Sequence, residues 1–207
     1  MSEDVRVSLF DYDSALRNNY KIFCGADEAG RGPLAGDVYA AAVILPEGCV
    51  IEGLNDSKKI SEKKREKLYD EIKKKAVSYC VATADIAEIE KINILNAAML
   101  AMKRAIEGLS VVPEAAFIDG NKCPQLDGIK TISVVKGDAS SASIAAASIL
   151  AKVERDRYMK EMALKYPQYA FEKHKGYGTK LHYQMIEKYG ACEIHRPSFL
   201  KKLNHDK

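Results

Sequence analysis

Short apolar runs alternate with longer, helix-like patterns along most of this chain of 207 residues. Such alternation of strands with helices is typical of the α/β class. Two of the short runs, 22–26 and 38–45, are joined by a glycine-rich connection too short for a crossover helix, so we expect an antiparallel pair. A chain of this length with 47% apolar residues can bury one sizeable core, and we therefore expect a single domain.

The later elements continue this alternation. Strands are expected at 77–84, 115–118 and 131–135, and helices at 61–75, 93–108, 140–163 and 182–189. The connection between the last two strands is short for a helical crossover, and its path stays open. Small side chains fill the first half of the helix at 140–163, so we expect that half close against the sheet, although an alanine-rich helix needs no such neighbour. Its charged second half, 152–157, is expected to project outward.

Two adjacent carboxylates, Asp27 and Glu28, follow the first strand and lead into a turn that contains Gly30, Arg31 and Gly32. The glycines allow a bend and let backbone N–H groups approach an anion, and the arginine adds positive charge. This pattern favours a site that holds a cation beside an anionic substrate. An ordinary surface turn would show the same short motif.

Asp119 and Asp138 also fall at or just after the ends of expected strands. In open α/β sheets such ends converge on one crevice. Carboxylates crowded there repel one another unless cations lie among them, and a set of oxygen ligands favours Mg²⁺ or Mn²⁺ over zinc. For Asp138, which precedes Ala139 and Ser140, an ordinary capping role fits equally well.

The order of the motifs resembles that of bacterial type 2 ribonuclease H (ribonuclease HII). The matching segments are DEAGRG, NDSKK, AAFIDGN, VKGDASSASIAAASILAKVERDRYM and HKGYGT, which together span nearly the whole chain. The resemblance implies a ribonuclease H-like α/β fold: a mixed five-stranded sheet flanked by helices, with a core at about 20–165 and a C-terminal, substrate-binding helical extension at 166–207.

The same resemblance implies an endonuclease that hydrolyses the RNA strand of RNA–DNA hybrids. It would also cut on the 5′ side of a single ribonucleotide embedded in duplex DNA, leaving 5′-phosphate and 3′-hydroxyl ends, and so remove misincorporated ribonucleotides. Asp27, Glu28, Asp119 and Asp138 match the family's catalytic, metal-binding carboxylates. Two divalent ions, Mn²⁺ or Mg²⁺, would activate a water and stabilise the leaving oxygen.

Further positions match residues that contact the substrate in this family. The turn at Gly30–Gly32 would recognise the 2′-OH through backbone contacts, and Tyr177 would pack against the sugar at the RNA–DNA junction. Lys58 and Lys59 would contact phosphates. An aromatic residue in a glycine loop and two solvated lysines would look the same without the resemblance. For Asp156 we expect a structural ion pair with a neighbouring arginine.

Cysteines, histidines and apolar segments limit the other possibilities. The five cysteines form no Cys-x-x-Cys pair, and no two of the four histidines have the i, i+4 spacing of a helical zinc site. We therefore expect free thiols, no zinc and no catalytic histidine. No signal peptide or membrane-spanning run is visible, and we expect a cytoplasmic monomer whose partner is nucleic acid rather than a membrane.

Two other functions are considered. A type 3 ribonuclease H would carry an additional N-terminal domain, whereas only about 20 residues precede the first strand here, and Arg31 stands where type 3 chains have lysine. A binding domain with a degenerate active site is opposed by retention of all four carboxylates. The segment PSFLKKL at 197–203 could dock a partner, although an ordered terminal segment is the simpler interpretation.

Overall fold

Strands and helices alternate through the part of the chain that the computed structural model describes, residues 3–201. The strands are β1 (Phe23–Ala29), β2 (Val38–Ile44), β3 (Ser78–Ala84), β4 (Ala115–Asp119) and β5 (Lys130–Val134). The α-helices are α1 (Glu3–Leu16), α2 (Glu62–Lys75), α3 (Ile86–Glu107), α4 (Ala142–Lys165), α5 (Phe171–His174), α6 (Lys180–Tyr189) and α7 (Pro197–Leu200). The end of the possible docking segment 197–203 lies outside the described residues.

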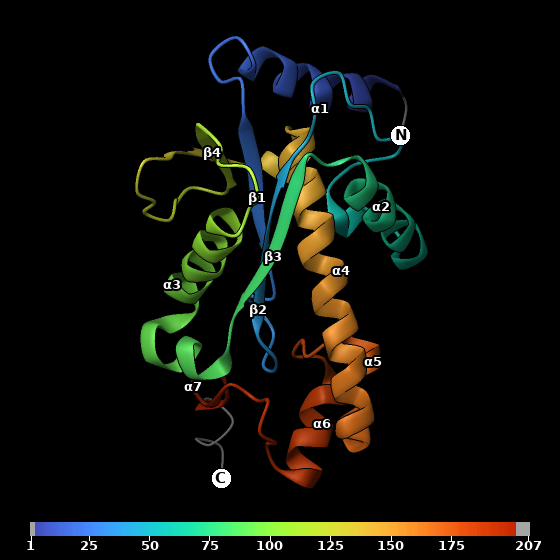
Figure 1. The fold of residues 1–207 in the computed structure, drawn as a ribbon. Coiled ribbons are helices and arrows are strands. Elements are labelled where there is room, and N and C mark those ends of the chain that lie inside the picture. Colours follow the sequence, from blue (N-terminus) through green and yellow to red (C-terminus); the bar gives the residue numbers. More distant parts are fainter. Residues whose placement is uncertain (1–2, 202–207) are drawn as a thin grey trace.

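The five strands form one mixed sheet in the order β3-β2-β1-β4-β5 (Figure 1). β1 pairs antiparallel with β2 and parallel with β4, which confirms the expected antiparallel pair and the α/β architecture. β5 runs parallel to β4, and the loop at 120–129 that joins them contains no helix. The path that the sequence left open is therefore a crossover made by irregular chain alone.

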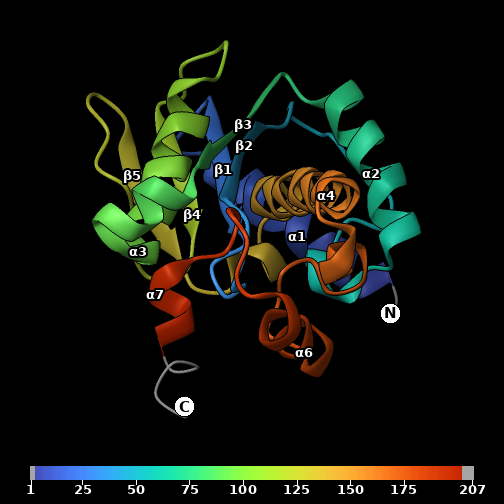
Figure 2. The same ribbon diagram turned by 90° about the horizontal axis from the view of Figure 1, so that it is seen from below.

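Helices cover both faces of the sheet (Figure 2). α3 packs on one face, and α4 packs on the other with α2 outside it. The N-terminal half of α4 lies as close to β1 as its small side chains predicted. A Cβ atom on Gly25 would lie 2.2 Å from the backbone nitrogen of Ile144, so only glycine fits at this position of β1. None of the helices in residues 3–201 has the length and hydrophobicity that a membrane span requires.

The start of α3 differs from the sequence-based prediction by seven residues. The helix was expected at 93–108, but it begins at Ile86, where Asp85 and Glu88 form a reciprocal capping box. Asn93, with φ of 67°, interrupts the helix and makes its second half look like a separate element. Helix α1 was not predicted at all, because its first turns carry no clear apolar periodicity.

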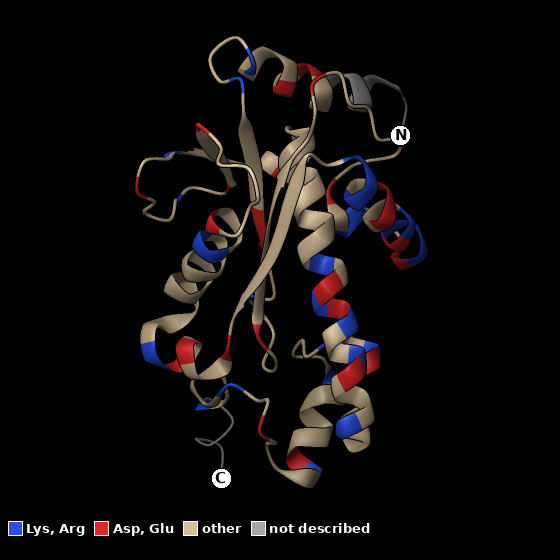
Figure 3. Ribbon diagram, in the orientation of Figure 1, with Lys and Arg blue, Asp and Glu red and all other residues tan. Residues whose placement is uncertain are grey.

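The charged second half of α4 does not project outward as expected. Figure 3 shows the charged residues that alternate along this half. Arg155 is nevertheless fully buried and Asp156 is only 4% exposed, because α2, α5 and the C-terminal segment pack around it. The predicted ion pair of Asp156 is confirmed in a different form. Its carboxylate lies 2.6 Å from Lys152 Nζ on α4, and its arginine partner, 3.6 Å away, is Arg65 of α2 rather than a neighbour on the same helix.

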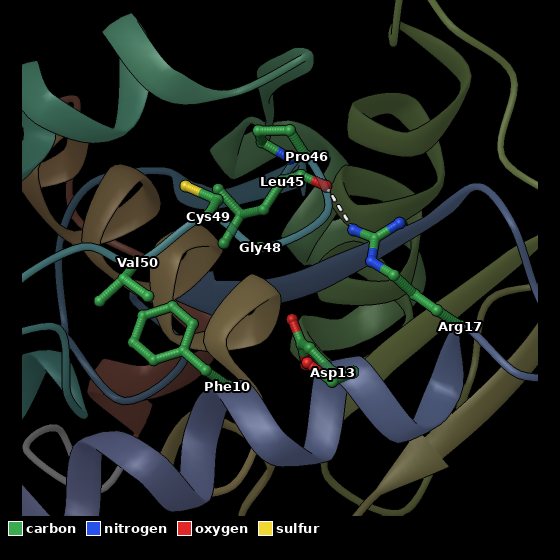
Figure 4. A pocket seen from close by; sticks show the side chains of 9 residues that line it. Phe10, Asp13, Arg17, Leu45, Pro46, Gly48, Cys49 and Val50 are labelled. Atoms are coloured by element: carbon green, nitrogen blue, oxygen red, sulfur yellow. Dashed lines mark hydrogen bonds between the residues drawn. The ribbon is translucent and has the colours of Figure 1, made fainter.

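At the other end of α4, Asp13 of α1 fixes the helix N-terminus. Its carboxylate accepts hydrogen bonds from the hydroxyl groups of Ser141 and Ser143, at 2.6 and 2.7 Å, and from the Ser143 backbone N–H. A pocket between α1 and the loop after β2 lies beside this contact (Figure 4). Arg17 closes one side of the pocket by donating to the Leu45 carbonyl at 2.7 Å.

Candidate active site

Three of the predicted carboxylates meet at one edge of the sheet. One oxygen each from Asp27, Asp119 and Asp138 lies within 4.8 Å of the others. Asp27 belongs to β1, Asp119 ends the adjacent strand β4, and Asp138 lies in a short 3-10 turn after β5. The three side chains converge because β1, β4 and β5 are neighbouring parallel strands that end at the same side of the sheet.

The backbone holds two of these carboxylates in place. Asp27 Oδ1 accepts a hydrogen bond from the Glu28 N–H at 2.7 Å, and Asp119 Oδ1 accepts one from the Gly137 N–H at 2.7 Å. The Ser148 hydroxyl of α4 also lies near Asp27 and acts to lower its pKa. Each aspartate therefore has a fixed orientation while part of its carboxylate stays available to another ligand.

Negative charge accumulates at this cluster. Burial raises the pKa of Asp27 well above its ordinary value, and the neighbouring Glu28 and Asp119 raise it further. Burial and the charge of Asp119 also raise the pKa of Asp138. A divalent cation among the three oxygens would relieve both the repulsion and the cost of burying charge. Because every donor is a hard oxygen, the cluster fits Mg²⁺ or Mn²⁺.

Glu28, the fourth predicted carboxylate, is placed differently. Its Oε1 lies 3.0 Å from NH1 of Arg31, and it is not part of the three-residue cluster. Glu28 follows Asp27 in β1, and successive strand residues point to opposite faces of a sheet. A side-chain rotation that releases Arg31 is therefore needed before Glu28 can join the other three.

The two predicted phosphate-binding lysines have different surroundings. Lys58 Nζ lies 4.0 Å from Asp138 Oδ2. Burial alone would lower the pKa of Lys58, but the negative charges of Asp27 and Asp138 raise it above its ordinary value. Ser57 anchors this loop to α4 through a 2.8 Å contact with the Ser148 hydroxyl. Lys59 points instead toward Asp56, at 3.9 Å, so only Lys58 faces the carboxylates.

Tyr177 and the glycine-rich turn lie side by side. Tyr177 is 43% exposed, and its Cε1 would lie 3.9 Å from a Cβ atom on Gly32. A hydrogen bond of 2.8 Å from the Leu34 N–H to the Gly176 carbonyl ties the two loops together. The structure therefore brings the two predicted substrate-recognition elements to one surface, although Gly32 and Tyr177 are 145 positions apart in the sequence.

Two buried arginines beneath this surface were missed by the sequence analysis. Arg155 of α4 donates to the carbonyls of Ala35 and Lys175, and it lies under the Tyr177 ring. Gly30, with φ of 101°, passes directly over it, and a Cβ atom there would lie 2.1 Å from Arg155 Nε. The second arginine, Arg196, donates to carbonyls of the turn itself. No local pattern distinguishes Arg155 from the charged residues around it, so sequence alone could not have found it.

A chain of histidines supports the loop that carries Tyr177. The Cys192 N–H donates to His195 Nδ1 at 2.9 Å, His195 Nε2 lies 3.0 Å from His182 Nε2, and His182 Nδ1 lies 3.0 Å from the Tyr177 carbonyl. Because the carbonyl can only accept, neutral rings satisfy these three contacts if His195 Nε2 and His182 Nδ1 carry the protons.

Stability should depend on pH through these rings. Burial lowers the pKa of His182 from 6.5 to about 4, so the unfolded chain binds a proton in this range that the folded protein excludes. The contribution of His182 to the unfolding free energy therefore rises with pH between these values. We predict that acidification from about pH 7.5 to 5 lowers the melting temperature of the wild type relative to that of His182→Gln. The measurement is thermal unfolding at several pH values.

A substitution on the same helix provides the control. Lys180→Gln changes a side chain of α6 that is not part of the histidine chain, so it should leave the pH dependence unchanged. An equal pH dependence in the wild type and in His182→Gln would contradict the neutral-histidine assignment.

Known proteins are similar to this chain in sequence and in fold. A family model described as Ribonuclease HII matches residues 24–202. A protein named ribonuclease HII from Caldicellulosiruptor bescii is 54% identical over 98% of each chain. Another, from Idiomarina loihiensis, is 58% identical over 86% of this chain and 95% of the relative. The crystal structure of ribonuclease H2 from Pyrococcus horikoshii OT3 is similar with a TM-score of 0.71 and 26% identity, over 86% of this chain and 93% of that one.

Proposed function

Because this chain belongs to the ribonuclease HII family, we propose that Asp27, Glu28, Asp119 and Asp138 are its metal-binding catalytic carboxylates. The protein is an endonuclease that hydrolyses the RNA strand of RNA–DNA hybrids, including on the 5′ side of single ribonucleotides in duplex DNA. It leaves 5′-phosphate and 3′-hydroxyl ends and serves ribonucleotide removal. The convergence of Asp27, Asp119 and Asp138 on one point is the observation that supports this site assignment.

The enzyme is metal-dependent, and the proposed ions are Mg²⁺ or Mn²⁺. When bound, two such ions supply an activated water and stabilise charge on the leaving oxygen. Asp27, Asp119 and Asp138 would hold them, and Glu28 would join after it separates from Arg31. The released Arg31 and Lys58 are then positive groups beside the cluster, suited to the phosphates of the cut strand.

The remaining proposed contacts concern the sugar. The backbone of the turn at Gly30–Gly32 would hydrogen-bond the 2′-OH, and Tyr177 would pack against the sugar at the junction. In this proposal the core at about 20–165 supplies the carboxylates, and the extension at 166–207 supplies Tyr177. One chain then carries the whole site and can act as a monomer. Lys59 has the weakest support, because it faces Asp56.

Neither alternative from the sequence gains support. The family model that matches the chain is that of ribonuclease HII, which argues against a type 3 enzyme. A non-catalytic binding domain would not need three crowded carboxylates, two of them buried.

The test of the function is cleavage of a DNA duplex that contains one ribonucleotide, beside an all-DNA duplex and a long RNA–DNA hybrid. We expect the single-ribonucleotide duplex and the hybrid to be cut with Mg²⁺ or Mn²⁺ and not with chelator, while the all-DNA duplex stays intact. Cutting of the hybrid alone would retain the nuclease but contradict the junction contacts. Absence of cutting in every duplex would instead favour the binding domain.

Asp119→Asn should remove catalysis and leave the fold intact. The amide oxygen of asparagine can still accept the Gly137 N–H, but the loss of one charged ligand disturbs the metal site. Since loss of groups outside the ligands themselves already costs 10–100-fold, we expect cleavage to fall by at least about 100-fold. Asp127→Asn, in the exposed β4–β5 loop, is the matched control. Near-normal turnover by Asp119→Asn would remove it from the ligand set.

Thermal unfolding gives a second readout of the same variant. Without divalent ions, Asp119→Asn should melt at a higher temperature than the wild type, because like charges no longer repel. Added Mg²⁺ should raise the melting temperature of the wild type more than that of the variant.

Tyr177→Ala should weaken junction-specific cutting more than general hybrid binding. The exposed ring stands beside Gly32 and has no part in the carboxylate cluster. We expect roughly a tenfold loss in kcat/KM on the single-ribonucleotide duplex, in the range of aromatic stacking on a nucleotide, and a smaller change in hybrid affinity. Tyr177→Phe should keep most of the activity. Tyr79→Ala, an exposed tyrosine on β3, is the control. Equal losses in cutting and binding would contradict the junction role.

A further inference from the structure

Every N–H donor of the Arg196 side chain forms a hydrogen bond with the glycine-rich turn or with the residues that follow it. The side chain is fully buried at the start of α7. Its guanidinium donates five hydrogen bonds of 2.6–3.1 Å, all to main-chain carbonyls: those of Gly30, Arg31, Pro33 and Gly36. A guanidinium group has five N–H donors, so none remains for another partner.

These contacts fix the direction in which the turn presents its N–H groups. In a trans peptide the C=O and N–H point in opposite directions, and the chain contains no cis peptide bond in residues 3–201. Arg196 draws the carbonyls of Gly30 and Arg31 inward, so the N–H groups of the same two peptides, those of Arg31 and Gly32, point away from it. Neither N–H donates to a protein acceptor in the part of the chain that the structure describes.

The two N–H groups lie where a sugar would be bound. Gly32 stands beside the exposed Tyr177 ring, and Glu28, which precedes the turn, follows Asp27 of the carboxylate cluster. The positive charge of Arg196 also polarises both peptides in the direction that strengthens their N–H donors. The surface between the turn and Tyr177 is thus a donor site with a fixed orientation.

We propose that Arg196 is a positioning residue for ribonucleotide selectivity: by holding the carbonyls of Gly30 and Arg31, it aims the N–H groups of Arg31 and Gly32 at the 2′-oxygen. The proposal rests on the function proposed above and deepens it. Arg196 itself touches neither the substrate nor the carboxylates.

The path of the main chain does not depend on Arg196 alone. The Arg196 N–H donates to the Leu34 carbonyl, and the Gly36 N–H donates to the Ile194 carbonyl, both at 2.8 Å. A short bridge also pairs Ala35 with His195. These bonds should keep the two segments together when the guanidinium is lost, while the peptides of the turn become free to rotate.

Arg196→Lys is the first test variant. Lysine keeps the positive charge, but its ammonium is a point donor that cannot span four carbonyls. The assay measures KM and kcat on the single-ribonucleotide duplex and Ki for an all-DNA duplex added as a competitor. Loss of folded protein lowers the apparent kcat and leaves KM and Ki unchanged, so the ratio of Ki to KM reports selectivity alone.

We expect KM for the ribonucleotide duplex to rise about tenfold, the value of one to two lost hydrogen bonds, while Ki for the all-DNA duplex stays within about twofold. Arg104→Lys is the matched control, because Arg104 also donates to a backbone carbonyl, that of Thr83, and lies on α3 away from the turn. An unchanged Ki to KM ratio in folded Arg196→Lys would overturn the proposal.

A second variant decides the question if Arg196→Lys does not fold. Ligation at Cys192 allows a synthetic C-terminal segment to carry Arg196→citrulline, which keeps the size and shape of the side chain but lacks the charge and replaces one NH₂ group by oxygen. The same rise in KM supports the proposal, and an unchanged ratio overturns it. If the wild type fails to cut the ribonucleotide duplex, the proposed function itself fails, which is a separate result.

Discussion

The close approach of α4 to β1 is the contact on which the rest of the site depends. At Gly25 the strand leaves no room for a side chain, and the backbone of α4 at Ile144 occupies that space. From this point the helix runs along β1, so residues farther along both elements meet in turn. Ser148 lies near Asp27, and seven residues later on the helix Arg155 lies beneath Gly30. A single helix therefore supports both the acidic cluster and the turn that follows it.

The acidic cluster and the two buried arginines, at opposite ends of this contact, differ in the partners that stabilise their charges. At the cluster, carboxylates are brought together with too few positive partners, which creates the demand for divalent cations. Beneath the turn, the buried guanidinium groups of Arg155 and Arg196 donate to main-chain carbonyls and form no ion pair with the carboxylates of the cluster. Acidic side chains thus stay available for metal, and the turn is held by groups that do not compete for it.

The sequence predicted those parts of the site that are local. Asp119 ends a strand, Asp138 follows one, and Asp27 lies near the end of β1. Strand ends can be placed from apolar patterns, so their convergence was foreseeable. The small residues of α4 foretold its close packing, and Gly25 confirms it. Contacts between residues far apart in the chain could not be predicted from the sequence.

The contacts of Arg196 and of the histidine chain form only when the C-terminal segment folds back beside the turn. The turn lies more than 150 residues earlier in the chain. The same limit explains the error in α4, whose charged half looked solvent-exposed because the elements that bury Arg155 come from elsewhere. The sequence analysis placed Glu28 after the end of the first strand, whereas β1 continues to Ala29, so its side chain points away from that of Asp27 and pairs with Arg31.

Anomalous diffraction from crystals grown with Mn²⁺ and a ribonucleotide-containing duplex would test the central claim most directly, because it locates metal and sugar together. The account predicts Mn²⁺ between the carboxylates of Asp27, Asp119 and Asp138, with the 2′-oxygen within hydrogen-bonding distance of the N–H groups of Arg31 and Gly32. Mn²⁺ bound away from these aspartates, or a ribose that does not contact the turn, would contradict it.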